Sequence, residues 1–161
     1  MVWQDGPGWI PVTGGNVWYK VIGSKQPGIP LVILHGGPGA PHDYLEPLSV
    51  LADERPVVFY DQLGCGNSDK PNDPALWTVE RFVEELGGVL TALGLKDVHL
   101  LGQSWGTTLA VEYMLRTKSD HVRSLILSAP FFSATRWIGD QRAHLARLPE
   151  KVQASVREAE L

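Results

Sequence analysis

The segment VHLLGQSWGTTLA, residues 98–110, decides the fold class of this chain of 161 residues. Its apolar run Val98–Leu101 predicts a buried strand, and the pentapeptide GQSWG leads from it into a helical pattern that ends near Thr117. A serine that attacks a substrate must lie on a sharp, strained turn between a strand and a helix, with small residues two positions before and after it. The segment therefore predicts that this turn exposes the hydroxyl of Ser104. The alternative interpretation is a glycine-rich turn that holds a serine by chance.

Apolar runs and loops alternate through the rest of the first part of the chain. Thr78 is placed to cap a helix that begins at the next residue, and Gly94 follows its last turn. The alternation predicts the α/β class, with a doubly wound, mostly parallel sheet that begins with an antiparallel hairpin across Gly14-Gly15. Such apolar runs are typical of strands buried on both faces. The expected strands are 9–12, 17–22, 31–34, 57–60, 98–101 and 122–127, and the helix is 79–93.

Residues 131–161 have a different pattern from the rest of the chain. They predict two polar helices divided by Pro149, with no strand between them. We therefore expect two parts, which are an α/β core over residues 1–130 and the start of a helical lid or cap over residues 131–161.

A second glycine-rich segment, HGGPG at residues 35–39, directly follows an expected strand. Acyl transfer passes through a tetrahedral oxyanion, which needs two preorganised N–H donors about 3 Å away. If Ser104 is the nucleophile, one donor is the N–H of Trp105 and the other comes from this loop. We expect Gly37 to be that second donor, with Gly36 as the alternative.

Other chemical roles for the glycine-rich loops are weaker. Phosphate binding at HGGPG is disfavoured, because the pattern Gly-x-Gly-x-x-Gly is absent and Pro38 has no N–H. In the loop DQLGCGNSDKP, residues 61–71, Cys65 has no evident base beside it, which disfavours a reactive thiol. We expect Asp61 to fix backbone N–H groups of that loop rather than to take part in chemistry.

Three motifs together resemble the α/β-hydrolase superfamily and, within it, the proline iminopeptidase family of serine aminopeptidases. They are HGGPG at 35–39, DQLGCGNSDKP at 61–71 and GQSWGTTLA at 102–110. The segment LPEKV, residues 148–152, is similar to the first cap helices of that family. The resemblance runs from about Trp9 onward.

The resemblance implies a role for each candidate residue and a reaction. Ser104 is the nucleophile, and the N–H groups of Gly37 and Trp105 form the oxyanion hole. His35 is a scaffold residue of its loop and not the catalytic base. The implied enzyme releases an N-terminal residue, often proline, from a peptide or an amino-acid amide or ester, and it uses no cofactor and no metal.

The catalytic acid and histidine have no convincing candidates in this sequence. In this fold they follow the serine along the chain, the acid first. Asp120 and His121 precede the last expected strand, so about six residues at ~3.3 Å each separate them from Ser104, far beyond hydrogen-bond reach. Asp140 and His144 lie four residues apart on an expected helix after the sheet, where a solvated helix face is the simpler interpretation. The remaining histidines, His42 and His99, are no better candidates for the catalytic histidine.

The last expected strand also indicates a missing part. Leu125–Leu127 make it apolar on both faces, yet no later strand can pair with its free edge. A bare apolar edge strand is an aggregation hazard. We therefore hypothesise that the chain is the N-terminal part of a hydrolase that ends inside the cap, and that a second polypeptide completes the sheet and the triad. Truncation is the alternative.

Two other functions stay open at this point. The expected turn and loop are common to hydrolases of this fold, so an amino-acid amidase or esterase is the first alternative. A non-catalytic, hydrolase-like binding module is the second, because the acid and the histidine are missing. An aminopeptidase also needs carboxylates that recognise a free α-ammonium group, and the sequence does not assign them.

The composition of the chain argues against several further classes of protein. The chain has 14 Lys and Arg against 18 Asp and Glu, a net charge of −4 and no basic cluster, which argues against nucleic-acid binding. No apolar run approaches the ~18 residues of a membrane span, and the N-terminus lacks the pattern of a signal peptide. A single cysteine, Cys65, excludes an internal disulfide and is consistent with a reducing compartment. We expect a cytoplasmic protein.

Overall fold

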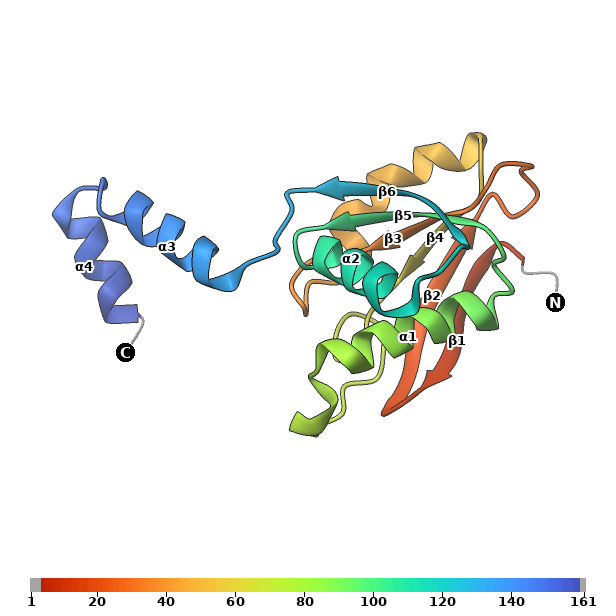
Figure 1. The fold of residues 1–161 in the computed structure, drawn as a ribbon, viewed down its shortest axis with the longest axis horizontal. Coiled ribbons are helices and arrows are strands. Elements are labelled where there is room, and N and C mark those ends of the chain that lie inside the picture. Colours follow the sequence, from red (N-terminus) through yellow and green to blue (C-terminus); the bar gives the residue numbers. More distant parts are fainter. Residues whose placement is uncertain (1–3, 160–161) are drawn as a thin grey trace. The chain divides into compact units, whose positions relative to one another are not determined.

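The computed structural model describes residues 4–159, which form two compact units that divide after Pro130. The first unit is built on a six-stranded sheet with the order β1-β2-β4-β3-β5-β6 (Figure 1). All the expected strands are confirmed, and several extend a few residues further. Their bounds are β1 Gly6–Val12, β2 Gly15–Ile22, β3 Leu31–Leu34, β4 Val57–Tyr60, β5 Val98–Gln103 and β6 Val122–Ser128.

The sheet is mixed, as the sequence predicted. Strands β1 and β2 form the antiparallel hairpin, β2 also pairs antiparallel with β4, and β4, β3, β5 and β6 run parallel to one another. The hairpin turn is tight, because Val12 pairs with Gly15 and Gly14 has a φ of +100° that favours glycine. Since the parallel strands all point the same way, the loops that follow them meet at one end of the sheet.

Helices α1, Val79–Ala92, and α2, Trp105–Thr117, cover one face of the sheet. The start of α1 is the expected one, because the Thr78 side chain accepts a hydrogen bond from the backbone N–H of Arg81 at 3.2 Å. Gly94 follows the helix with a φ of +62°, as a C-terminal glycine does. The two helices pack against alternate strand residues, which include Val32, Leu34, Val58, Tyr60 and Leu100.

The other face of the sheet is covered by a 3₁₀ segment, η1, His42–Asp53, which the sequence analysis did not predict. Leu45, Leu48 and Leu51 of η1 pack on the strand residues that alternate with the first set, namely Leu31, Ile33, Val57 and Phe59. Pro47 lies inside the segment and breaks the regular α-helical pattern. A shorter 3₁₀ turn, η2, Pro74–Leu76, precedes α1.

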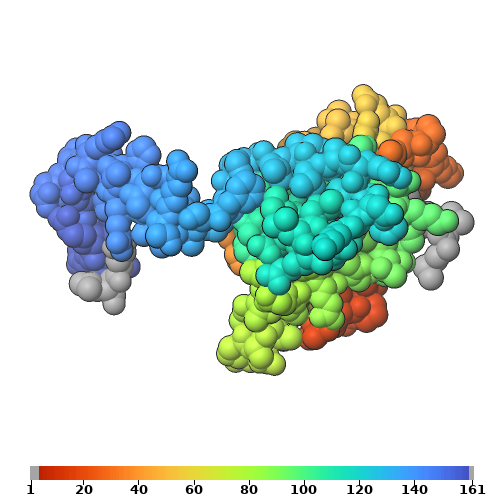
Figure 2. All heavy atoms as spheres, in the orientation of Figure 1, coloured from red at the N-terminus to blue at the C-terminus, as the bar shows by residue number. Residues whose placement is uncertain are grey.

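Strand β6 differs from the expectation that all the apolar strands are buried on both faces. Within the described residues it pairs only with β5, and most of its side chains are exposed. The physical reason is that no further strand or helix covers this edge of the core unit in residues 4–130. In Figure 2, β6 and α2 lie side by side on the surface turned to the viewer.

The second unit contains α3, Ala134–Leu145, and α4, Glu150–Ala159, and Pro149 directly precedes α4. These are the two polar helices that the sequence predicted, and their role as the start of a cap stays a prediction. Among residues 4–159, no helix is both long and apolar enough to span a membrane.

Candidate active site

The residue between β5 and α2, Ser104, has a strained backbone. Its φ is +51° and its ψ is −117°, a conformation that costs a non-glycine residue on the order of 1–3 kcal/mol. Its backbone N–H donates a 2.9 Å hydrogen bond to the carbonyl of Ser128 at the end of β6. The Ser104 side chain makes no capping hydrogen bond to the first turn of α2, and the residue is partly exposed. The turn therefore does not use this hydroxyl as a helix cap.

The two glycines that flank this turn are required by close backbone contacts. A Cβ on Gly102 would lie 2.3 Å from the carbonyl oxygen of Gly106, and a Cβ on Gly106 would lie 2.0 Å from the carbonyl oxygen of Leu34. Real Cβ atoms do not approach a backbone oxygen so closely, so any larger residue would displace α2 from the sheet. The Gly-x-Ser-x-Gly spacing in this chain thus has a packing reason as well as a conformational one.

The HGGPG loop after β3 is tied to the residue before the serine. The backbone N–H of Gly36 donates to the Tyr44 hydroxyl at 2.7 Å, and this hydroxyl donates to Oε1 of Gln103 at 2.6 Å. A Cβ on Gly36 would lie 2.6 Å from that same Gln103 oxygen, so a larger residue would have to move the end of the Gln103 side chain. Gly37 follows with a φ of +113°. The N–H of Gly36 is therefore engaged by a side chain, whereas Gly37 has the unusual backbone conformation.

Tyr44 was missed by the sequence analysis. It lies in η1, eight residues after Gly36 and 59 residues before Gln103. No local pattern marks such a tyrosine, because its partners come close only when β3 and β5 pair. The strand pairing of Leu34 with Gly102 is what brings the two loops together.

His35 is fully buried, and its hydrogen bonds connect the HGGPG loop to Gln62 in the loop after β4. Its Nε2 accepts a hydrogen bond from the backbone N–H of Gln62 at 2.9 Å, and the Gln62 side chain donates to the His35 carbonyl at 3.0 Å. Burial lowers the pKa of His35, which keeps the ring neutral. Oε1 of Gln62 in turn accepts from the Trp105 indole N–H at 2.9 Å. The same glutamine therefore connects the loop after β3 with the first residue of α2.

Asp61 fixes backbone N–H groups, as the sequence predicted. One carboxylate oxygen accepts from the backbone N–H of His42 at 2.9 Å, and the other accepts from the backbone N–H of Asn67 at 2.9 Å. The first oxygen also accepts from the His42 ring at 2.8 Å. Burial alone would raise the pKa of Asp61, but these hydrogen bonds from Asn67 and His42 hold it below its ordinary value. His42, which stacks on Trp18, is a structural partner of this loop.

The Cys65 thiol is not suited to nucleophilic chemistry. Burial raises its pKa to about 12, and its Sγ donates to the carbonyl of Gln62 at 3.0 Å. A thiol that stays protonated at neutral pH is a poor nucleophile. The structure supports the expectation of an unreactive thiol, but the reason given from the sequence was wrong, because Nε2 of His35 lies 3.5 Å from Sγ of Cys65. That nitrogen already accepts a hydrogen bond from the backbone N–H of Gln62.

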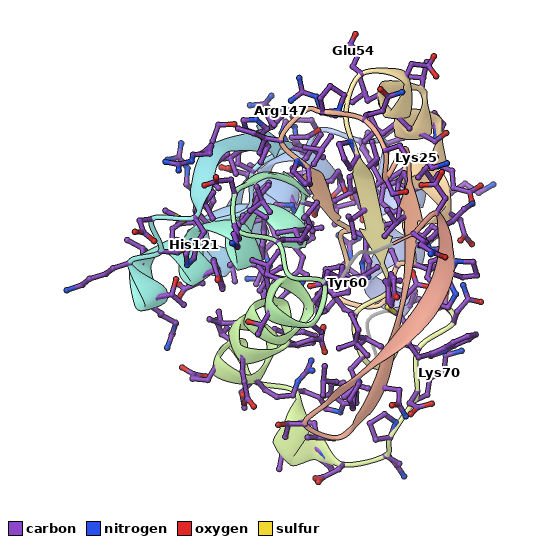
Figure 3. All side chains as sticks on the ribbon, turned by 90° about the vertical axis from the view of Figure 1, so that its right-hand side faces the viewer. Lys25, Glu54, Tyr60, Lys70, His121 and Arg147 are labelled. Carbon is purple, nitrogen blue, oxygen red and sulfur yellow. The ribbon has the colours of Figure 1, made fainter. Side chains whose placement is uncertain are left out.

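Of the acid and histidine pairs considered from the sequence, Asp120–His121 lies away from Ser104 within the core unit, and Asp140–His144 belongs to the second unit. His121 lies where β6 begins, and Figure 3, which views the core unit from that end, shows it there. Ser104 lies at the opposite end, after β5. In the second unit, Asp140 pairs with Arg136 one turn earlier, at 3.9 Å. His99 contacts the Ser124 hydroxyl at 2.7 Å on the neighbouring strand.

Comparison with known proteins identifies the family to which the chain belongs. A model of the alpha/beta hydrolase fold family matches residues 29–159. The chain is 49% identical over 153 residues to the proline iminopeptidase of Heyndrickxia coagulans, covering 95% of this chain and 53% of that protein. It is 44% identical over 157 residues to the proline iminopeptidase of Lactobacillus acidophilus, covering 96% of this chain and 54% of that protein.

Solved structures agree with this result. The proline iminopeptidase of Mycobacterium smegmatis superposes with a TM-score of 0.84, and VinJ superposes with a TM-score of 0.90. Each is 36% identical to this chain, and each match covers 96% of this chain and 54% of the other. The chain therefore spans about half the length of the relatives it matches. On the family match and the fold together, this chain belongs to the α/β-hydrolase fold family.

Proposed function

We propose that the protein containing this chain is a serine hydrolase that releases an N-terminal residue from peptides, in the manner of a proline iminopeptidase. The observation that carries the proposal is the strained turn at Ser104, with glycines that allow α2 and β3 to approach it. The similarity to curated proline iminopeptidases supports the choice of substrate class. The scaffold of hydrogen bonds around His35 and Tyr44 supports a preorganised site.

In the proposed reaction, the Ser104 hydroxyl attacks the carbonyl carbon of the N-terminal residue and gives its proton to a histidine. The carbonyl oxygen becomes an oxyanion, which accepts hydrogen bonds from the N–H groups of Gly37 and Trp105. The C–N bond then breaks, the histidine protonates the leaving amine, and an ester on Ser104 remains. Water hydrolyses this ester in a second step of the same kind. No cofactor enters these steps.

The choice of Gly37 over Gly36 has a structural basis. The N–H of Gly36 already donates to Tyr44, so using it for the oxyanion would break a 2.7 Å hydrogen bond. Gly37 is the next N–H along the loop, and its φ of +113° turns this peptide in a way that a side chain would not tolerate. This arrangement supports Gly37 and Trp105 as the two donors.

The acid and the histidine of the triad are proposed to come from outside residues 1–161. The relatives extend to about twice the aligned length, so they contain sequence that this chain does not match. The open edge of β6 is the place where further strands of the sheet would pair. Nothing in the comparisons supports the separate second polypeptide that the sequence analysis suggested.

Two further parts of the proposal concern the second unit and the location of the protein. Residues 131–159 are proposed as the start of the cap. We also propose a cytoplasmic location, which suits a chain with a single, buried cysteine.

The test uses the complete protein that contains this chain. We expect a fluorophosphonate probe to label it once, at Ser104, and Ser104→Ala to remove both the labelling and the hydrolysis of a proline arylamide. Ser155→Ala, which alters an exposed serine of α4, is the matched control and should change neither. Faster hydrolysis of a simple acyl ester than of the arylamide would favour the esterase alternative. A folded protein that takes up no probe would favour the binding module.

A further inference from the structure

A pocket of about 450 Å³ lies beside the first residue of α2. Aromatic rings and apolar side chains form most of its lining, to which the end of the HGGPG loop also contributes. The residues that matter for the argument are Pro38, Gly39, Leu63, Trp77, Phe82 and Trp105. All of them belong to the core unit.

The pocket is held in shape by contacts among its own walls. The Trp77 ring stacks near Phe82 with centroids 6.5 Å apart, and Phe82 meets Trp105 edge to face at 5.5 Å. Gly64 has a φ of +97°, and a Cβ there would lie 2.8 Å from the Trp77 ring. The indole N–H of Trp105 is fixed by Gln62. A rigid aromatic pocket of this kind binds a flat or branched apolar group at low entropic cost.

None of the described residues that line this pocket carries a charge. An ammonium group placed inside it would lose its hydration without an opposite charge as compensation. The aromatic faces do not form a free cation site either, because the guanidinium of Arg81 already lies 4.0 Å from the centroid of the Phe82 ring. The pocket therefore suits an uncharged, apolar part of a ligand.

The pocket lies next to the proposed oxyanion donors, so its position indicates which side of the scissile bond it can bind. The backbone of Trp105 supplies one proposed oxyanion donor while its ring forms a wall, and Pro38 directly follows Gly37, the other donor. A substrate carbonyl held by these donors is therefore next to the pocket. In a free N-terminal residue, the carbon beside that carbonyl carries the ammonium group, which the pocket does not favour. The residue on the other side of the scissile bond carries no such charge.

We propose that this pocket binds the apolar side chain of the residue that follows the scissile bond, so that the enzyme prefers peptides with a large apolar second residue. This inference rests on the proposed function. It assigns the pocket to the leaving side of the substrate, and it leaves recognition of the N-terminal ammonium group to carboxylates elsewhere.

The test compares two substrates of the complete enzyme that differ only in the second residue, prolyl-phenylalanine amide and prolyl-glycine amide. We expect kcat/KM to be about tenfold higher for the phenylalanine substrate, as burial of one apolar group predicts. Trp77→Ala should remove most of this preference, so that kcat/KM falls much more for prolyl-phenylalanine amide than for prolyl-glycine amide. The control is Trp9→Ala, because Trp9 is also an exposed tryptophan, on β1, but does not line the pocket.

A second measurement does not depend on turnover of these substrates. N-acetyl-phenylalanine amide, an uncharged mimic of the leaving side, should inhibit at a concentration about tenfold lower than N-acetyl-glycine amide, and Trp77→Ala should weaken that inhibition. Equal rates on both substrates with normal probe labelling of Ser104 would overturn the pocket assignment alone. An effect of Trp77→Ala on the choice of N-terminal residue would also overturn it. Loss of labelling together with loss of all hydrolysis would overturn the proposed function and, with it, this inference.

Discussion

Strands β3 and β6 both lie parallel to β5, one on each side, and both have an apolar sequence. All four residues of β3 are buried, whereas Ile126 and Leu127 of β6 are 43% and 38% exposed. The difference arises from the neighbours, since β3 has a strand on each side and helical segments on both faces. An apolar sequence predicts a strand that is buried in the folded protein. It does not show whether the elements that bury the strand belong to the same part of the chain.

The two sides of β5 also hold the serine turn differently. On the β3 side, Gly106 packs against the Leu34 carbonyl, and Tyr44 links the HGGPG loop to Gln103. On the β6 side, a backbone hydrogen bond joins Ser104 to Ser128. We infer that the β3 side sets the geometry of the turn, and four predictions test this, from the largest expected effect to the smallest.

The largest effect is expected from Gly106→Val, which places a Cβ only 2.0 Å from the Leu34 carbonyl oxygen. We expect a loss of more than about 4 kcal/mol in the free energy of unfolding, enough to prevent folding of many domains. Chemical denaturation followed by circular dichroism measures it. Gly88→Ala is the control, because a Cβ there meets nothing within 4 Å and alanine favours a helix. Normal stability of the Gly106 variant would mean that α2 does not press on β3.

The next prediction compares one residue from each side of β5. Ile33→Ala removes a fully enclosed side chain and should cost about 2–5 kcal/mol, while Leu127→Ala should cost about 1 kcal/mol or less, because its side chain is partly in solvent. The same denaturation experiment on residues 1–161 alone gives both numbers, because in the complete protein the further strands proposed above would cover β6. Equal losses in this shorter chain would break the comparison.

Tyr44→Phe tests the link between the two loops without a change in packing. We expect kcat to fall about 10- to 100-fold with little change in KM, because the oxyanion loop loses its tie to Gln103 while substrate contacts stay. Stability should change by about 1 kcal/mol or less, since the ring is half-exposed. Tyr19→Phe on β2 serves as the control. An unchanged kcat would rule out a positioning role for Tyr44.

The smallest effect concerns pH and the buried His35. Burial lowers the pKa of His35 in the folded state, so the unfolded chain takes up a proton first as the pH falls below about 6.5. The contribution of His35 to stability is therefore complete above that pH and declines below it. We expect the free energy of unfolding to fall less between pH 7.5 and 5.5 in His35→Gln than in the unchanged protein. Parallel pH profiles for the two would contradict this.

Much of the fold could be predicted from local sequence because the signals are local. The bounds of β3 and β4 match the apolar runs, Thr78 caps α1, and the glycines around Ser104 mark the turn. In each case the physical cause lies within a few residues of the effect. The segment η1 was missed because Pro47 breaks its pattern and contacts with the sheet support it.

The sequence by itself determined the strand–turn–helix unit at Ser104, the hairpin and the α/β class, since backbone preferences and hydrophobic periodicity act over short distances. Only the tertiary structure decided which partners meet. Tyr44 reaches Gln103 across 59 positions, and the Trp105 ring reaches Gln62 across 43. It also decided that β3 is enclosed while β6 lies open. Contacts of this kind depend on which strands pair, and no local pattern records that order.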